Sequence, residues 1–179
     1  AFDLSQSARS DYIGAAHTDT GHMGDALILD GTLDALNTNL LNVNTIAMWI
    51  KPADENNQFV LFSDEQDNDY TYLCDITPSN KLRSYHCSNC GGPKITSTAD
   101  IPMGKWTHIV VTAFTTGQYI NASIYINGEL DINDQSLASV SQYALHAQRI
   151  GCALDDGALE DCLDGAIDEL MIWERVLSG

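Results

Sequence analysis

Three carboxylates are the first candidates for chemistry in this chain. Glu65, Asp67 and Asp69 stand at alternate positions, the spacing at which residues of one β-strand share a face. Two carboxylates on one face could act as the acid and base of a glycoside hydrolase. These three, however, lie between the apolar segments 59–62 and 70–73, where a hairpin turn is needed. The pattern therefore favours a solvated turn over a catalytic pair.

Serine and histidine residues do not form a recognisable nucleophilic site either. The sequence contains no Gly-x-Ser-x-Gly elbow, the turn that exposes a catalytic serine in hydrolases of one large fold. His108 lies within an apolar, strand-like segment, which favours a structural role for its side chain. We therefore expect a protein that is not an enzyme.

Two of the five cysteines are placed to form a disulfide. Cys152 ends one strand-like segment and Cys162 begins the next, and a polar loop containing Asp155, Asp156 and Gly157 joins the two. The cysteines then lie at facing ends of a hairpin, where a disulfide is geometrically easy. The acidic loop itself, with Asp161, is expected to be a solvated hairpin.

The other three cysteines depend on the register of a second hairpin. If residue 76 faces residue 82 across the turn at 77–81, Cys74 lies opposite Ser84 and Cys87 points to the other face. Cys87 then pairs with Cys90, and Cys74 remains a free buried thiol. A register shifted by one residue would instead permit a bridge between Cys74 and Cys87.

The spacing of Cys87 and Cys90 also allows a redox pair or half of a zinc site. Neither is favoured, because no βαβ pattern surrounds the two cysteines and no second pair is spaced for zinc. Two disulfides require an oxidising compartment. The expected location is extracellular, at the cell surface or in the periplasm.

The charge balance excludes several partners. The 8 Lys and Arg against 25 Asp and Glu give a net charge of −17, which disfavours nucleic acid and anionic membranes. The same acidity suits Ca²⁺, or it simply keeps the surface solvated.

The sequence contains no run of roughly 18 apolar residues, the length that a membrane-spanning helix needs. The chain also begins without a basic and apolar leader, so we expect one module excised from a larger protein.

Short strands dominate the remaining pattern. Segments such as 45–50, 58–63 and 69–76 are apolar and bounded by turn-forming residues, and helical periodicity is almost absent. Asn127-Gly128 follows an alternating segment and predicts a tight hairpin, since both residues tolerate a positive φ. Strands at this spacing predict an antiparallel two-sheet β-sandwich. Trp49, Trp106 and Trp173 lie inside apolar strands and are expected in its core.

Four segments carry a resemblance to a known family. They are Ala26 to Gly31, Gly104 to Thr112, Ala122 to Glu129 and the closing strand from Asp164 to Ser178, which ends in Trp173 and Glu-Arg-Val-Leu-Ser. Together they resemble laminin-G-like domains of the concanavalin A-like lectin and glucanase superfamily. This resemblance implies that residues 1–179 form a single jelly-roll β-sandwich domain.

The resemblance also implies sites. Sandwiches of this superfamily often hold a calcium ion where the first and last strands meet, which would use Asp168, with Asp30 and backbone oxygens near Gly24 as further ligands.

Tyr70, Tyr72 and Tyr85 flank one hairpin and could stack on a sugar. The expected function is an extracellular recognition or adhesion module that binds a glycan or cell-surface ligand. The alternatives are a structural spacer in a large surface or pilus-associated protein, and a glycan-active enzyme of the same fold.

Overall fold

The computed structural model describes residues 12–14, 17–41, 44–53, 59–66, 69–85, 94–116, 119–138, 146–155 and 158–177, and every regular element in these ranges is a β-strand. Within them, no helix is long and apolar enough to cross a membrane. The strands are β1 (Tyr12–Ile13), β2 (His17–Thr20), β3 (Asp25–Asp30), β4 (Ala35–Leu41), β5 (Thr45–Pro52), β6 (Phe59–Gln66), β7 (Asp69–Ile76), β8 (Lys81–Tyr85), β9 (Lys94–Asp100), β10 (Thr107–Thr116), β11 (Tyr119–Ile126), β12 (Glu129–Ala138), β13 (His146–Ile150), β14 (Ala153–Asp155), β15 (Ala158–Glu160) and β16 (Asp164–Trp173).

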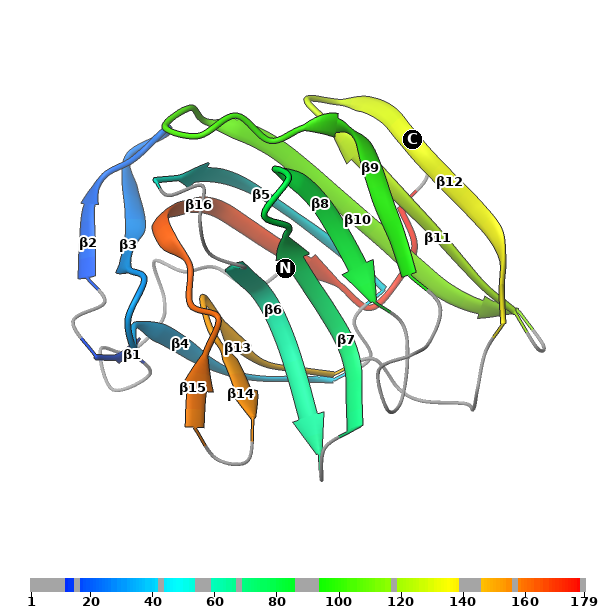
Figure 1. The fold of residues 1–179 in the computed structure, drawn as a ribbon, viewed down its shortest axis with the longest axis horizontal. Coiled ribbons are helices and arrows are strands. Elements are labelled where there is room, and N and C mark those ends of the chain that lie inside the picture. Colours follow the sequence, from blue (N-terminus) through cyan, green and yellow to red (C-terminus); the bar gives the residue numbers. More distant parts are fainter. Residues whose placement is uncertain are drawn as a thin grey trace.

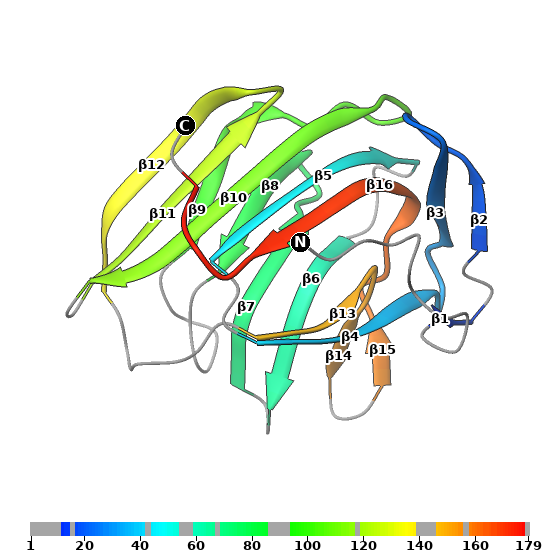
Figure 2. The same ribbon diagram turned by 180° about the vertical axis from the view of Figure 1, so that it is seen from behind.

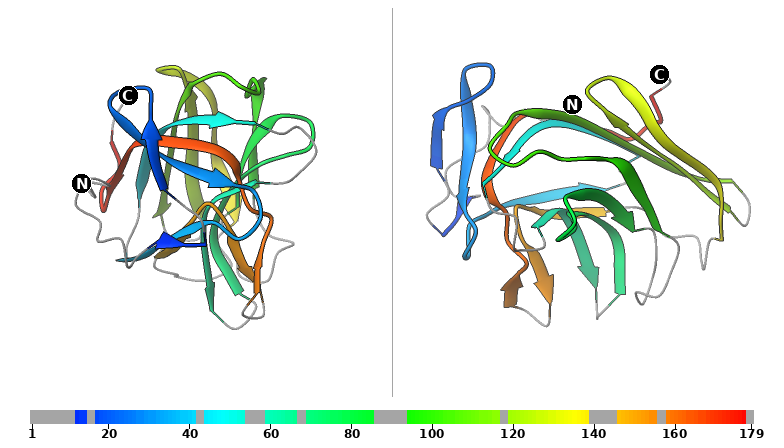
Figure 3. Two further views of the ribbon diagram at one scale, coloured as in Figure 1. Left: turned by 90° about the vertical axis from the view of Figure 1, so that its left-hand side faces the viewer. Right: turned by 45° about the horizontal axis from the view of Figure 1, so that its top comes forward.

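Two seven-stranded antiparallel sheets make up the body of the molecule. Sheet A has the order β1-β4-β13-β6-β7-β8-β9, and sheet B has the order β12-β11-β10-β5-β16-β3-β2. The strands β16, β5 and β10 of sheet B arch above β4 and β13 of sheet A (Figure 3). The short hairpin β14–β15 projects beside β6 (Figure 1). The predicted all-β, two-sheet sandwich is confirmed.

Alternating side chains from both sheets form one core between them. Ile46, Met48 and Ile50 of β5 are at most 2 % exposed and meet Ile76 and Leu82 of sheet A in the same apolar cluster. Because successive residues of a strand point to opposite faces, the residues between these core positions lie on the outer face of their sheet.

Backbone conformation explains two of the sequence signals. Asn127 and Gly128 both have positive φ (52° and 85°), and they join β11 to β12 where Ile126 pairs with Glu129. In the closing strand, a Cβ at Gly165 would clash with the backbone oxygen of Lys51 in β5. Glycine there lets β16 lie in the middle of sheet B, between β5 and β3 (Figure 2).

The hairpin that carries the three alternate carboxylates forms as predicted. Glu65 pairs with Tyr70 and Gln66 with Asp69 at the end of the hairpin where β6 leads into β7. Glu65 and Asp69 therefore stand at strand ends beside the turn, and Asp67 lies outside the described residues.

The prediction that the three tryptophans lie in the core is wrong. Trp49, Trp106 and Trp173 are all half-buried. Trp49 alternates along β5 with the core residues Met48 and Ile50, so it lies on the outer face of sheet B. The apolar run around it left the choice of face open, because apolar residues occur on both sides of this strand.

Candidate functional site

A row of paired residues crosses sheet A from β4 to β9. We call it the cross-sheet row, and its members are Asn37, Arg149, Ser63, Leu73, Tyr85 and Lys94. Asn37 is exposed and Arg149 half-buried, whereas their chain neighbours Leu36 and Ile150 are fully buried in the core. Asn37 and Arg149 therefore lie on the outer face of sheet A.

Arg149 is held on this face by an amide. Its Nη1 donates a hydrogen bond of 2.8 Å to Oδ1 of Asn37. Its Nε is buried and has no hydrogen-bond partner. Burial lowers the pKa of Arg149, and no neighbouring charge contributes to the shift. The guanidinium is thus partly desolvated and oriented by a neutral partner.

A second arginine on the same sheet is fully occupied by a carboxylate. Arg83 of β8 donates from Nε to Oδ1 of Asp75 (2.9 Å) and from Nη2 to Oδ2. Only 2 % of the Asp75 side chain and 16 % of the Arg83 side chain are exposed. Burial raises the pKa of Asp75, and the guanidinium of Arg83 opposes that shift. This bidentate pair spans β7 and β8, where Asp75 and Arg83 are register partners.

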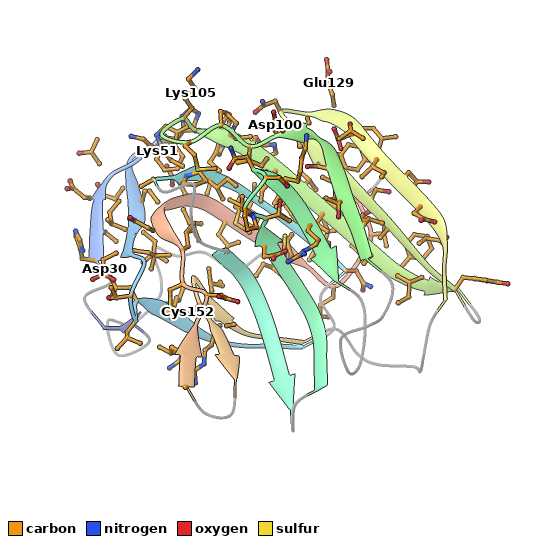
Figure 4. All side chains as sticks on the ribbon, viewed as in Figure 1. Asp30, Lys51, Asp100, Lys105, Glu129 and Cys152 are labelled. Carbon is orange, nitrogen blue, oxygen red and sulfur yellow. A yellow bond between two sulfur atoms is a disulfide. The ribbon has the colours of Figure 1, made fainter. Side chains whose placement is uncertain are left out.

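The β14–β15 hairpin brings a third charged group to the pair. Asp161 follows β15 and is exposed; partial desolvation raises its pKa, and the charge of Arg83 opposes the shift. The predicted disulfide between Cys152 and Cys162 closes the base of this hairpin, and Figure 4 labels Cys152 there. Both cysteines are buried beside Ala35. The disulfide thus fixes the segment that carries Asp161 next to the ion pair.

The three predicted ligand-binding tyrosines occupy two neighbouring strands. Tyr70 and Tyr72 belong to β7, where they pair with Glu65 and Asp64 of β6. Tyr85 belongs to β8 and is a member of the cross-sheet row. The side chains of all three lie outside the described part of the chain. Their role in binding stays a prediction.

The second cysteine group follows the predicted register. Cys74 pairs with Ser84 and Ile76 with Leu82, and Cys74 is a free, buried thiol. Burial raises its pKa strongly, so the thiol stays protonated and unreactive. The predicted bridge between Cys87 and Cys90 lies outside the described residues.

Asp168, the predicted calcium ligand, makes hydrogen bonds to the backbone instead. The residue is 3 % exposed. Its Oδ2 accepts the N–H of Met23 (2.8 Å), and its Oδ1 accepts that of Glu169 (2.7 Å). A Cβ at Gly21 would lie 2.6 Å from Oδ2. The hydrogen bonds of this carboxylate therefore link the turn between β2 and β3 to the bulge in β16.

Asp30, the second predicted ligand, lies at another point of the same strand pair. Asp30 faces Asp164, four residues from Asp168, which is roughly 13 Å along a strand. Hydrogen bonds from Thr32 lower its pKa. Asp30 and Asp168 therefore do not share one ion. The described residues hold no group of three or more metal-binding side chains. Backbone carbonyls and water can complete a calcium shell, so calcium binding stays a prediction.

An aromatic cluster covers part of the outer face of sheet B. The ring of His22 lies over Trp49 with centroids 3.9 Å apart and lies 5.8 Å from Trp106. His108 approaches Trp49 to 5.2 Å, and desolvation lowers its pKa. The structural role expected for His108 fits this packing.

Sequence reasoning missed Asn37, Arg83 and Arg149. A local signal existed for both arginines, because each stands next to a core residue of its strand, Leu82 before Arg83 and Ile150 after Arg149. Since neighbouring residues of a strand point to opposite faces, both arginines occupy outward-facing positions. The pairing of Asn37 with Arg149 has no local signal, because the two residues are 112 positions apart.

Comparison with known families agrees with this architecture. Residues 24–179 match the model of the concanavalin A-like lectin/glucanases superfamily. The chain therefore belongs to this superfamily, and the resemblance seen in its strand motifs is confirmed. No curated protein sequence matches the chain.

Several solved structures share the fold at low sequence identity. Domain 4 of AbnA, an extracellular GH43 arabinanase of Geobacillus stearothermophilus in complex with arabinotriose, is 22 % identical, with a TM-score of 0.66 over 92 % of this chain and 78 % of that chain. The CBM40 of the Ruminococcus gnavus IT-sialidase, bound to α2,3-sialyllactose, is 16 % identical, with a TM-score of 0.66 over 86 % and 91 %. The heptameric SAP-like pentraxin of Limulus polyphemus is 16 % identical, with a TM-score of 0.61 over 80 % and 70 %.

Proposed function

We propose that this protein is a non-catalytic carbohydrate-binding module whose binding surface is the outer face of sheet A. The observation that carries the proposal is the set of fixed polar groups on that face. Arg149 and Asn37 present hydrogen-bonding groups from β13 and β4, and the buried ion pair of Arg83 with Asp75 links β8 to β7 in the same sheet. Between Arg149 on β13 and Tyr85 on β8 lie three strand spacings, about 14 Å, which is room for a short oligosaccharide.

The solved relatives support a carbohydrate ligand. Two that share the fold over most of this chain were solved with an oligosaccharide, arabinotriose in one and sialyllactose in the other. They do not identify the sugar that this chain binds, since fold alone does not fix a ligand.

Asp75, a carboxylate on this face, is not free to take part in glycoside hydrolysis. A glycosidase needs one carboxylate free to transfer a proton and a second free to attack or to activate water. Asp75 is instead held by both of its oxygens in the ion pair with Arg83. A glycan-active enzyme would need other carboxylates than this one.

An oxidising, extracytoplasmic location accompanies the proposal. The disulfide between Cys152 and Cys162 would persist outside the reducing cytosol. The acidic chain makes nucleic acid an unfavourable partner.

Calcium at Asp168 is a separate proposal, and the binding face does not depend on it. The test is thermal unfolding with added Ca²⁺ and with a chelator, using Asp168→Asn as the control variant. A midpoint raised by Ca²⁺ in the wild type but not in the variant supports the site. Equal midpoints in both conditions contradict it.

A glycan array tests the proposed function directly. The wild type is compared with Asn37→Trp, which introduces a bulky ring at an exposed position of the binding face, and with Glu129→Trp, the same ring at the exposed β11–β12 turn of sheet B. We expect glycan binding by the wild type and by Glu129→Trp and its loss in Asn37→Trp. Silence of the wild type on the whole array would favour a structural spacer, and release of reducing sugar would favour an enzyme.

A further inference from the structure

Arg149 differs from the other partly buried cations of sheet A. Lys81 forms an ion pair with Asp100 (2.6 Å), and Arg83 forms the bidentate pair with Asp75. Among the described residues, no carboxylate pairs with Arg149; its one hydrogen bond goes to the neutral amide of Asn37. In a chain with 25 acidic residues and 8 basic ones, a half-buried arginine without an acidic partner among the described residues calls for an explanation.

Leaving Arg149 in this state has an energetic cost. The buried Nε makes no hydrogen bond, and an unsatisfied buried donor destabilises the folded protein. A guanidinium has five N–H donors in a planar fork, and toward the described residues Arg149 makes a hydrogen bond from Nη1 alone. Because Nε is buried, a ligand would meet the guanidinium at its Nη groups, whose N–H donors can also pair with the two oxygens of a carboxylate. An incoming carboxylate would give the guanidinium the charged partner that the described residues do not supply.

We propose that Arg149 binds the carboxylate of an acidic sugar, a uronate or a sialate, and that Asn37 orients the guanidinium for that contact. This inference rests on the proposed carbohydrate-binding function and adds the ligand class. A single carboxylate suits this position better than a phosphate or a polysulfated chain, because one arginine offers one bidentate edge and the net charge of −17 repels dense negative charge.

We also expect the affinity for an acidic sugar to depend only moderately on ionic strength. The surrounding acidic surface acts at long range and is screened beyond about 8 to 10 Å at physiological salt, whereas the paired contact at Arg149 is short. Added salt should therefore weaken binding of an acidic sugar only moderately.

The experiment compares sugars that differ only in charge. A glycan array carrying acidic glycans and their neutral methyl esters, including sialyllactose and trigalacturonate each with its ester, is probed with the wild type. Isothermal titration calorimetry then measures the best acidic and neutral pair for the wild type, Arg149→Gln, Arg149→Lys, Asn37→Ala and the control Arg175→Gln. Arg175 is exposed just beyond β16 and loses the same charge in the control.

We expect the wild type to prefer the acidic member of each pair it binds. Arg149→Gln should lose at least about tenfold in affinity for the acidic sugar, the size of one charged hydrogen-bonding contact, with less than a twofold change for the neutral one. Arg149→Lys keeps the charge but lacks the paired N–H groups, so its affinity for the acidic sugar should lie between those of the wild type and Arg149→Gln. This variant also tests the inference if Arg149→Gln does not fold. Asn37→Ala should weaken acidic binding only, and Arg175→Gln should bind like the wild type.

Two results would overturn the inference in distinguishable ways. If the wild type binds neutral and acidic counterparts equally, or if Arg149→Gln and Arg149→Lys keep the acidic preference, the ligand class is wrong and the carbohydrate-binding function stands. If the wild type binds no glycan at all, both proposals fail together.

Discussion

Asp131 of β12 accepts both the N–H (2.7 Å) and the hydroxyl (2.8 Å) of Thr98 in β9. The N–H of Ala99 donates to the same carboxylate at 2.8 Å. β12 is an edge strand of sheet B and β9 an edge strand of sheet A, so one carboxylate links the open edges of the two sheets. The figures show these strands side by side at the end of the sandwich farthest from β2 and β3 (Figures 1 and 3).

Removing this link should destabilise the sandwich. Asp131→Ala loses three hydrogen bonds to a charged acceptor, and because the carboxylate is partly exposed we expect a loss of about 1 to 3 kcal/mol in the free energy of unfolding. Chemical denaturation measures it. Glu129→Ala, an exposed acidic residue at the start of the same strand, is the matched control and should change stability by no more than about 0.5 kcal/mol. Equal effects of the two substitutions would contradict the link.

The same carboxylate should make stability depend on pH in the acid range. Burial opposes ionisation of Asp131, but the hydrogen bonds from Thr98 and Ala99 and the charge of Lys81 outweigh it and lower the pKa below the ordinary 3.8. A pKa depressed by folding contributes stability that is present above the unfolded value and lost as pH falls through the folded one.

The measurement is the free energy of unfolding at a series of pH values below about 5. The wild type should lose stability more steeply than Asp131→Asn, which has no carboxylate to protonate at this position. Parallel curves for the two proteins would show that Asp131 does not contribute to the acid dependence.

Reduction of the disulfide should loosen the hairpin that carries Asp161. Cys152 and Cys162 are ten residues apart, and closing a loop of this size contributes about 2 to 3 kcal/mol in the chain-entropy account. A reducing agent should therefore lower the unfolding midpoint of the wild type. The double variant Cys152→Ala with Cys162→Ala should unfold below the midpoint of the oxidised wild type in either condition, and the reducing agent should shift its midpoint less. A reductant effect of equal size in both proteins would rule out this disulfide as its source.

The sequence predicted those features that depend on neighbouring residues. The hairpin at Asn127-Gly128 follows from local backbone preference, and the register that places Cys74 opposite Ser84 follows from counting back from the turn. The disulfide was predictable because its two cysteines flank one short hairpin. Local geometry decided each of these cases.

The features that the sequence did not predict depend on contacts between distant strands. Arg149 meets Asn37 only because β13 returns beside β4, and nothing near either residue indicates that return. The positions of Asp30 and Asp168 were inferred correctly as neighbouring strands, β3 and β16, but their offset along those strands required the register. The outward face of Trp49 required knowing which side of β5 meets sheet A.

The contact between His22 and Trp49 offers a measurable check on the outer face of sheet B. With ring centroids 3.9 Å apart, a double-mutant cycle of His22→Ala and Trp49→Leu should give a coupling energy of about 0.5 to 1.5 kcal/mol. The reference cycle pairs His22→Ala with Trp173→Leu, another half-buried tryptophan of the same sheet.

Trp173 pairs with Thr45, four residues along β5 from Trp49, so it lies roughly 13 Å farther along the strand. Substitutions at that separation should add independently, and the reference coupling should be near zero. A coupling of His22 to Trp49 no larger than its coupling to Trp173 would mean that the imidazole does not rest on the indole in solution, and that Trp49 is more exposed than the structure indicates.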